Sequence, residues 1–163
     1  MFANTKKRID YWRNMTKKLY STPVFWLNLD VCSRLFEDFR ETLKFDEPIP
    51  DFSTRFPGKL EGILNSVKQT FGGEHLNPTI LDASAAYFNQ FVRGHAFING
   101  NKRMAVLFTH FFLLVHDIDF SLKPSEMYTL AIIIARAGED NIDAQETKQL
   151  CKKIIEKFTE RRK

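Results

Sequence analysis

Hydrophobic side chains recur every three or four positions along most of the chain, which is the spacing of one face of an α-helix. This pattern predicts helices over about residues 5–20, 29–43, 60–69, 79–93, 101–117, 127–138 and 145–157. No strand-rich region competes with them. We therefore expect an all-α fold, a compact single-domain helical bundle of about six to seven helices that spans residues 1–163.

The helix over residues 101–117 is apolar nearly all round after its first turn, so we expect it to be the buried central helix. His110 lies inside this apolar run, and we expect it to be a core histidine with satisfied hydrogen bonds rather than a ligand. His116 falls near the helix end, where the helix dipole favours a positive charge. A polar tip on an otherwise apolar helix is typical of a functional site.

Two stretches interrupt the helical pattern. Residues 46–58 hold three prolines and a glycine, which predicts an extended connector. Residues 69–73, QTFGG, follow the short helix that begins at residue 60, and their paired glycines predict a hairpin-like turn.

The composition fits one domain with a substantial core, because 44% of the 163 residues are hydrophobic and 27% are charged. Cys32 and Cys151 lie far apart without metal-ligand spacing, so we expect neither a zinc site nor a disulfide. No apolar run is long enough to cross a bilayer, and no signal-peptide pattern follows the first positive charges. We therefore expect a cytoplasmic protein without a membrane partner.

The net charge of +4 and the isoelectric point near 9.1 are a mild excess that does not identify a partner. Much of the excess lies near the two ends of the chain, as solvated helix faces would give. We do not expect nucleic acid as a partner. The alternative is a binding module that grips nucleic acid through the basic helix from Lys6 to Lys18.

The most informative stretch is residues 95–103, HAFINGNKR, in which a glycine turn opens directly into a helix. Free backbone N–H groups and the helix dipole make such a start an anion cradle. Gly100 would let a bulky anion approach the backbone, and Asn101 would donate from its side chain. Lys102 and Arg103 add positive charge. We expect these four residues to bind phosphate.

His95 precedes this turn and is suited to accept a proton from an alcohol near neutral pH. Phe97 is expected to point inward and anchor the loop. A base beside a phosphate cradle indicates phosphoryl or nucleotidyl transfer to a hydroxyl. An ordinary turn that carries a structural histidine is the alternative that these features leave open.

HAFINGNKR resembles the signature loop of the Fic/Doc (death-on-curing) family, His-x-Phe-x-Asp/Glu-Gly/Ala-Asn-Gly/Lys-Arg. The chain departs from it at Asn99, where the family usually has an acidic residue, and at Val106, where longer motifs carry a second arginine. Lys102 without that second arginine resembles the Doc branch. The resemblance implies a Fic/Doc-like helical bundle whose signature loop is residues 95–103.

The resemblance reaches upstream to residues 57–73, which look like the segment that forms the substrate flap. It implies a short flap hairpin within about residues 57–76. Thr70, Phe71 and Gly72 would then form the edge on which a target segment docks by main-chain pairing.

The resemblance also implies a transferase that uses ATP, with His95 deprotonating a hydroxyl of a protein target. Lys102 favours phosphoryl transfer, as by a Doc-like toxin acting for example on a translation factor. Fic-type AMPylation is one alternative. A catalytically weak or inactive Fic-fold binding module is another.

Asn99 bears on the metal that this chemistry implies. An acidic residue at this position would coordinate Mg²⁺, and an amide offers an oxygen without the charge, so we expect Asn99 to be at most a weak ligand. Glu74 and Asp82 are the acidic groups that we consider as possible substitutes near the site.

Regulation is expected to come from another chain. The autoinhibitory motif of many Fic proteins, Ser/Thr-x-x-x-Glu-Gly/Asn, is missing, because the only Glu-Gly pair, Glu61-Gly62, has Pro57 at the hydroxyl position. We therefore expect a separate antitoxin or inhibitory chain as a partner.

Overall fold

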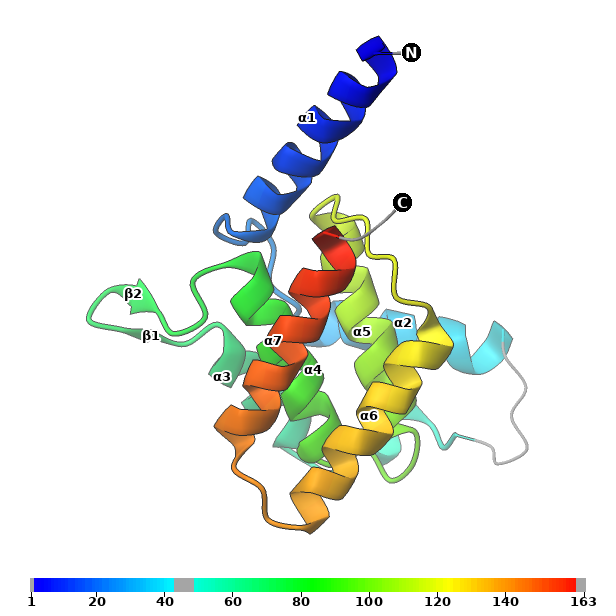
Figure 1. Ribbon diagram of the computed structural model, residues 1–163. Helices are drawn as coiled ribbons and strands as arrows, with labels where there is room; N and C mark the ends of the chain where they lie inside the picture. Colours follow the sequence, from blue (N-terminus) through cyan, green and yellow to red (C-terminus); the bar gives the residue numbers. More distant parts are fainter. Residues whose placement is uncertain (1, 43–48, 161–163) are drawn as a thin grey trace.

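Seven α-helices make up most of the residues that the computed structural model describes, which are 2–42 and 49–160 (Figure 1). The helices are α1 (Phe2–Leu19), α2 (Leu29–Thr42), α3 (Lys59–Val67), α4 (Ile80–Arg93), α5 (Asn101–Val115), α6 (Pro124–Glu139) and α7 (Ala144–Glu160). The expected all-α fold is confirmed. Within the described part of the chain, a short 3₁₀ helix η1 (Phe52–Thr54) and one hairpin complete the structure. Residue 43 of the second expected helix and residues 46–48 of the connector lie outside the described residues.

Helix α4 is the centre of the bundle, and α3, α5, α6 and α7 all pack on it. Eleven of its fourteen residues are buried. The helix begins at Thr79, whose hydroxyl oxygen accepts the backbone N–H of Asp82. Its alanines, Ala83, Ala85 and Ala86, are buried and let the neighbouring helices approach closely.

The expectation that the helix from residue 101 would be the buried central one is therefore wrong in part. One face of α5 is in the core, with Met104, Phe108 and Phe112 fully buried. The opposite face, which includes Val106, is only half-buried. Apolar residues in a sequence indicate burial, but they do not show how completely the neighbouring helices cover each face.

Aromatic rings connect the core to the loop between α4 and α5. The ring of Phe97 stacks on Phe36 of α2, with 5.0 Å between ring centroids, and lies 6.2 Å from Phe108 of α5. Phe108 in turn makes an edge contact with Phe91 of α4 at 5.2 Å. Helices α2 and α5 thus fix the position of this loop residue, and the prediction that Phe97 points inward and anchors the loop is confirmed.

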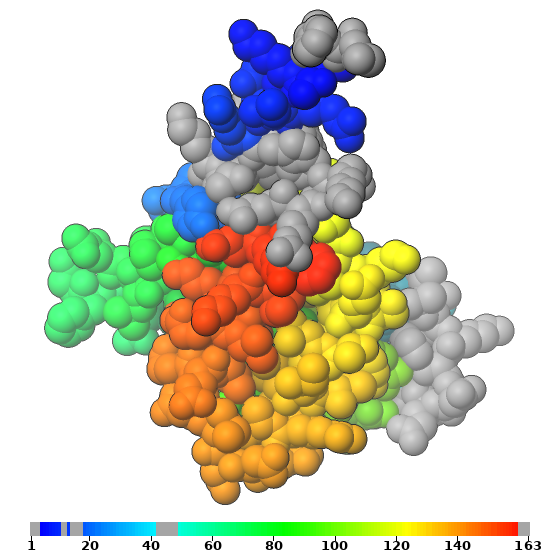
Figure 2. Space-filling model, viewed as in Figure 1, coloured from blue at the N-terminus to red at the C-terminus, as the bar shows by residue number. Residues whose placement is uncertain are grey.

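A two-stranded hairpin projects from the bundle (Figures 1 and 2), formed by β1 (Thr70–Phe71) and β2 (Glu74–His75). Gly72 and Gly73 have φ angles of 60° and 84°, as a two-residue turn with two left-handed positions requires. The expected hairpin is confirmed. Its base is held by the His75 ring, which lies 4.9 Å from the ring of Trp26.

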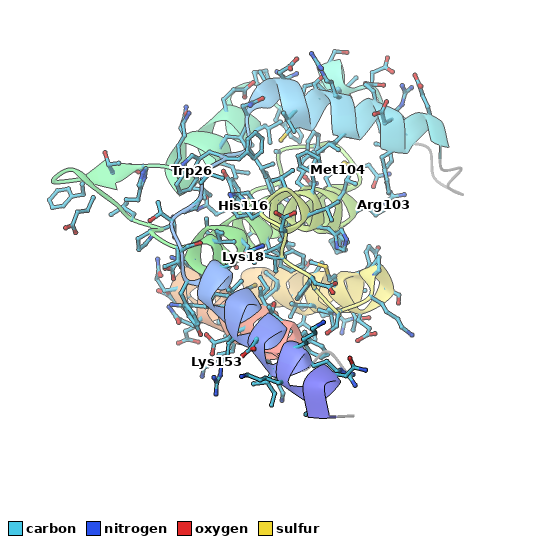
Figure 3. The ribbon with its side chains drawn as sticks, turned by 90° about the horizontal axis from the view of Figure 1, so that it is seen from above. Lys18, Trp26, Arg103, Met104, His116 and Lys153 are labelled. Atoms are coloured by element: carbon cyan, nitrogen blue, oxygen red, sulfur yellow. The ribbon has the colours of Figure 1, made fainter. Side chains whose placement is uncertain are left out.

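Helix α1 confirms the predicted N-terminal helix, and most of it extends beyond the bundle (Figures 1 and 2). Its last residue, Leu19, is buried, and α1 contacts α7. Lys18 and Lys153 lie on these two helices (Figure 3). None of the helices in the described residues combines the length and the hydropathy that crossing a membrane takes.

The two cysteines are buried free thiols, Cys32 in α2 and Cys151 in α7. Burial raises the pKa of each thiol to about 12. Both side chains therefore stay protonated near neutral pH and pack as small apolar groups.

The Tyr87→Phe substitution tests a buried connection in this core. The hydroxyl oxygen of Tyr87 accepts the backbone N–H of Leu27 at 3.0 Å. Its removal leaves that donor unpaired, so we expect the free energy of unfolding to fall by about 1–3 kcal/mol. Urea denaturation measures the change. Tyr128→Phe, at a side chain that is 38% exposed, is the matched control, and equal losses in both variants would contradict the prediction.

Candidate functional site

The loop between α4 and α5 is held by the side chain of Asn101. Its amide nitrogen donates to the carbonyl oxygen of Phe97 at 2.8 Å, and its amide oxygen accepts the N–H of Phe97 at 2.9 Å. Phe97 is only 4% exposed. The polar atoms of this side chain therefore hold the loop, and the group that Asn101 offers to an anion in this conformation is its backbone N–H.

Gly100 makes the sharp turn into α5 with a φ angle of 84°. A side chain there would be strained, and its Cβ would lie 3.2 Å from Cδ1 of Ile49. Ile49 thus fills the space on that side of Gly100, and the positive φ angle shows why the turn requires a glycine.

The first turn of α5 presents positive potential toward the loop. Gly100 has no side chain to cap the helix, so the backbone N–H groups of the first turn remain available to an anion. Lys102 and Arg103 lie in the same turn, and both are half-buried. The structure thus brings together the predicted phosphate-binding residues at one helix start.

Asn99 lies beside this helix start. Its side-chain oxygen accepts the N–H of Gly100 at 2.7 Å and lies 3.5 Å from Nη2 of Arg103. The oxygen that was expected to bind Mg²⁺ weakly therefore faces a guanidinium group, which disfavours a cation at the same place. Among the residues that the structure describes, no cluster of three His, Cys, Asp or Glu side chains is arranged to hold a metal.

The two acidic substitutes do not supply the missing ligand. Asp82 lies at the far end of α4, about 16 Å along the helix from Arg93, and its carboxylate pairs with Lys152 at 2.8 Å. Glu74 lies in the hairpin and is exposed. The residues around Asn99 thus do not fit a magnesium ion held by protein carboxylates.

His95 is exposed and has a φ angle of 47°, which is rare outside glycine. It borders a polar cavity of about 180 Å³ together with Arg93, Gly138 and Glu139. Arg93 ends α4 two residues before His95, so its proximity follows from the sequence, whereas no sequence pattern indicated that Glu139, at the end of α6, would lie beside His95. A strained backbone conformation of this kind persists only where surrounding contacts hold the residue in place, and such residues cluster at active sites.

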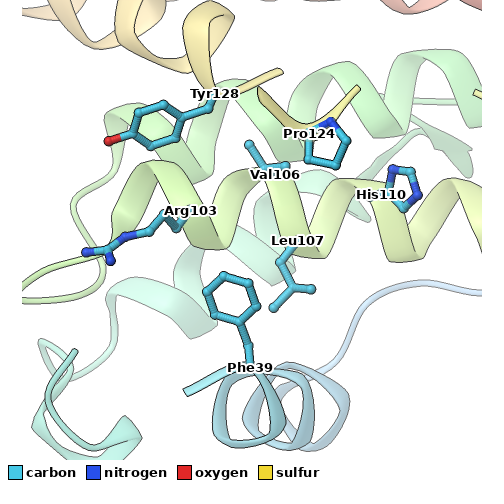
Figure 4. A pocket seen from close by; sticks show the side chains of 7 residues that line it. All are labelled: Phe39, Arg103, Val106, Leu107, His110, Pro124 and Tyr128. Carbon is cyan, nitrogen blue, oxygen red and sulfur yellow. The ribbon is translucent and has the colours of Figure 1, made fainter. Parts of the chain in front are cut away.

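A second and larger cavity lies between α2, α5 and α6 (Figure 4). Its volume is about 320 Å³, and it is lined by Phe39, Arg103, Val106, Leu107, His110, Pro124 and Tyr128. Sequence reasoning missed this cavity. The signal was present in part, since Arg103, Val106 and His110 recur at helical spacing on one face.

His110 does not behave as expected. Its Nδ1 is buried and has no hydrogen-bond partner among the described residues, so the expectation of a satisfied core histidine is wrong. Burial lowers the pKa of His110. His116 is instead the satisfied histidine, because its Nδ1 lies 2.8 Å from the carbonyl oxygen of Phe112 and its Nε2 accepts the N–H of Val24 at 3.1 Å.

Comparison with known proteins identifies one family. A family model described as the Fic/DOC family matches residues 27–113, which is slightly more than half of the chain and includes the whole loop between α4 and α5. No curated protein shows significant sequence similarity to the chain.

The Asn101→Ala substitution tests whether this side chain holds the loop. It removes both hydrogen bonds to the Phe97 backbone, and we expect the free energy of unfolding to fall by about 1–3 kcal/mol. Binding of inorganic phosphate at the start of α5 should weaken as well, because the loop loses its fixed geometry. Urea denaturation and calorimetry measure the two effects. Asn65→Ala, at an exposed position of α3, should change neither, and an unaltered Asn101→Ala protein would refute the role.

Proposed function

Because the chain belongs to the Fic/DOC family, we propose that it transfers a phosphoryl group from ATP to a hydroxyl side chain of a protein target, as the Doc branch does. The family suggests transfer of a nucleotide-derived group to a protein. The observation that carries the proposal is the helix start of α5, where Lys102 and Arg103 lie in the first turn of the helix that follows the His95 loop.

In the proposed reaction the phosphates of ATP bind the backbone N–H groups of the first turn of α5. Lys102 and Arg103 offset their charge. His95 takes the proton from the target hydroxyl, whose oxygen attacks the γ-phosphorus. The new O–P bond forms as the bond between the γ-phosphorus and the β–γ bridging oxygen breaks, and ADP leaves with that electron pair.

Phosphoryl transfer suits the distribution of positive charge better than AMPylation does. AMPylation releases pyrophosphate, whose two phosphate groups need cations beyond the site that holds the α-phosphate. Val106 stands where longer Fic motifs have a second arginine, and it borders an apolar cavity. One cluster of cations at the first turn of α5 therefore favours attack on the terminal phosphate.

A magnesium ion that accompanies ATP would depend on the nucleotide for its ligands. The side-chain oxygen of Asn99 accepts from Gly100 and faces Arg103. In the proposed reaction the charge on the phosphates is therefore offset mainly by Lys102, Arg103 and the helix start.

The hairpin supports a role in docking the protein target. Strand β1 has an open edge beside its pairing with β2, and Phe71 next to the turn is 81% exposed. A target segment would add to the edge formed by Thr70, Phe71 and Gly72 through main-chain hydrogen bonds. A separate antitoxin chain would restrain the enzyme, and purification from the native operon without a small bound partner would count against this part of the proposal.

A transfer assay tests the activity. We expect label from γ-³²P-ATP to appear on one protein of a host lysate, and His95→Ala to abolish that label. Label from α-³²P-ATP would instead show AMPylation. Full activity of His95→Ala would remove the histidine from the mechanism. Steep salt-dependent binding of RNA or DNA without any transfer would favour the nucleic-acid-binding alternative.

The Asn99→Asp substitution tests the metal dependence. A carboxylate at this place would add negative charge beside Arg103, so we expect ATP to bind about tenfold more weakly in EDTA. Added Mg²⁺ should restore binding, because the carboxylate is a better metal ligand than the amide. Calorimetry with and without Mg²⁺ measures the two affinities. The same Mg²⁺ dependence in wild type and variant would contradict this account of position 99.

A further inference from the structure

A buried chain of hydrogen bonds joins the last turns of α4 to the first turn of α7. The hydroxyl of Thr147 accepts from Nη1 of Arg93 at 3.0 Å and donates to Oδ1 of Asn89 at 2.6 Å. The amide nitrogen of Asn89 donates in turn to the carbonyl oxygen of Ala144 at 3.0 Å. The chain thus runs from a charged guanidinium to the backbone of α7, and each of its bonds polarises the next.

This polar chain lies where apolar side chains would ordinarily pack. Asn89 and Thr147 are each only 4% exposed, and both lie where α4 and α7 pack together (Figure 1). Paired polar groups in a core add little net stability over apolar groups of the same shape. Contact between the two helices alone therefore does not explain this pair, and Arg93, at the other end of the chain, indicates what it holds.

The side chain of Arg93 is held between two helices. Its Nη1 bonds Thr147 of α7, and its Nε lies 3.4 Å from the point where a Cβ would stand on Gly138 of α6. Arg93 is also the last residue of α4, where the negative end of the helix dipole favours a cation. The end of α4 is therefore fixed to both of these neighbours.

The next residue, Gly94, is fixed by close packing. Its N–H donates to the carbonyl oxygen of Gln90 at 2.7 Å. A Cβ on Gly94 would stand 2.6 Å from that oxygen and 2.7 Å from Cδ1 of Ile63 in α3, so a side chain does not fit. His95 follows directly, with its φ angle of 47°. Its strained backbone thus begins from two residues whose positions α3, α6 and α7 determine.

We propose that Arg93 is a positioning residue for His95, the base of the proposed reaction. The buried pair of Asn89 and Thr147 fixes Arg93, which holds the backbone on one side of His95, as Phe97 does on the other. The inference rests on the proposed function and adds residues of α4 and α7 to it. Because the His95 ring is exposed, the fixed backbone rather than packing of the ring has to place it at the border of its cavity.

Two substitutions that differ in a single hydroxyl test the inference. Thr147→Val keeps the shape of the side chain and removes the hydroxyl, whereas Thr147→Ser keeps the hydroxyl. Since a small displacement of a reacting group slows a reaction strongly, we expect Thr147→Val to lower the rate of γ-phosphoryl transfer at saturating ATP about tenfold, with the KM for ATP changed less than about twofold. Thr147→Ser should stay close to wild type. Thr129→Val, at an exposed hydroxyl of α6, is the matched control and should leave the rate unchanged.

Amide hydrogen exchange gives a readout that does not need the reaction. We expect the N–H of Gly94 to exchange about tenfold faster in Thr147→Val, measured relative to the N–H of Phe88 in the middle of α4, because the end of the helix opens locally. A general loss of stability would instead speed up the exchange of Phe88. If Thr147→Val does not fold, Arg93→Met takes its place, since it keeps the unbranched stem and removes the guanidinium.

Three results would each overturn the inference and leave the proposed function standing. They are unchanged transfer by Thr147→Val, unchanged relative exchange at Gly94, and equal loss of transfer in Thr147→Ser and Thr147→Val. A wild-type protein that transfers no label would overturn the proposed function itself. The exchange of Gly94 would in that case still decide whether Thr147 fixes the segment before His95.

Discussion

The two hydrogen bonds between the Asn101 side chain and the backbone of Phe97 are the constraint on which the rest of the site depends. They tie the loop to the first residue of α5, so the loop and the helix start form one connected piece. The Phe97 ring then fixes that piece to α2 and α5 through aromatic contacts. The position of His95, two residues before Phe97, follows from these contacts.

The charges around this loop are arranged for an anion. Lys102 and Arg103 reinforce the dipole of α5, while Asp82 pairs with Lys152 and Glu74 lies in the exposed hairpin. Asn99 keeps the geometry of a hydrogen-bonded oxygen at the helix start without adding negative charge. In this chain a phosphate therefore meets less electrostatic repulsion than it would beside an acidic residue at position 99. A metal ion, in turn, is stabilised less by Asn99 than it would be by a carboxylate there.

The sequence predicts much of the fold because helical spacing, proline-glycine breaks and paired glycines act locally. Helices, the hairpin turn and the inward position of Phe97 all follow from such signals. The role of α4 as the central helix does not, because burial depends on how neighbouring helices close over each face. His110 shows the same limit: its apolar flanks predict burial, but whether its nitrogen finds a partner depends on side chains of other helices.

The candidate site shows where motif and geometry differ. HAFINGNKR forms one loop and the start of α5, but the hydrogen bonds of the Asn101 amide and the direction of the Asn99 oxygen are set by loop closure, which no sequence spacing encodes.

The hairpin has a further consequence for how the protein behaves at high concentration. Open strand edges usually invite pairing between identical chains, and an exposed phenylalanine adds to that tendency. Strand β1 is only two residues long, and its neighbour Glu74 carries a charge. An edge this short gains too few main-chain hydrogen bonds to hold two copies together. The hairpin can therefore bind a segment with complementary side chains without promoting self-association of the protein.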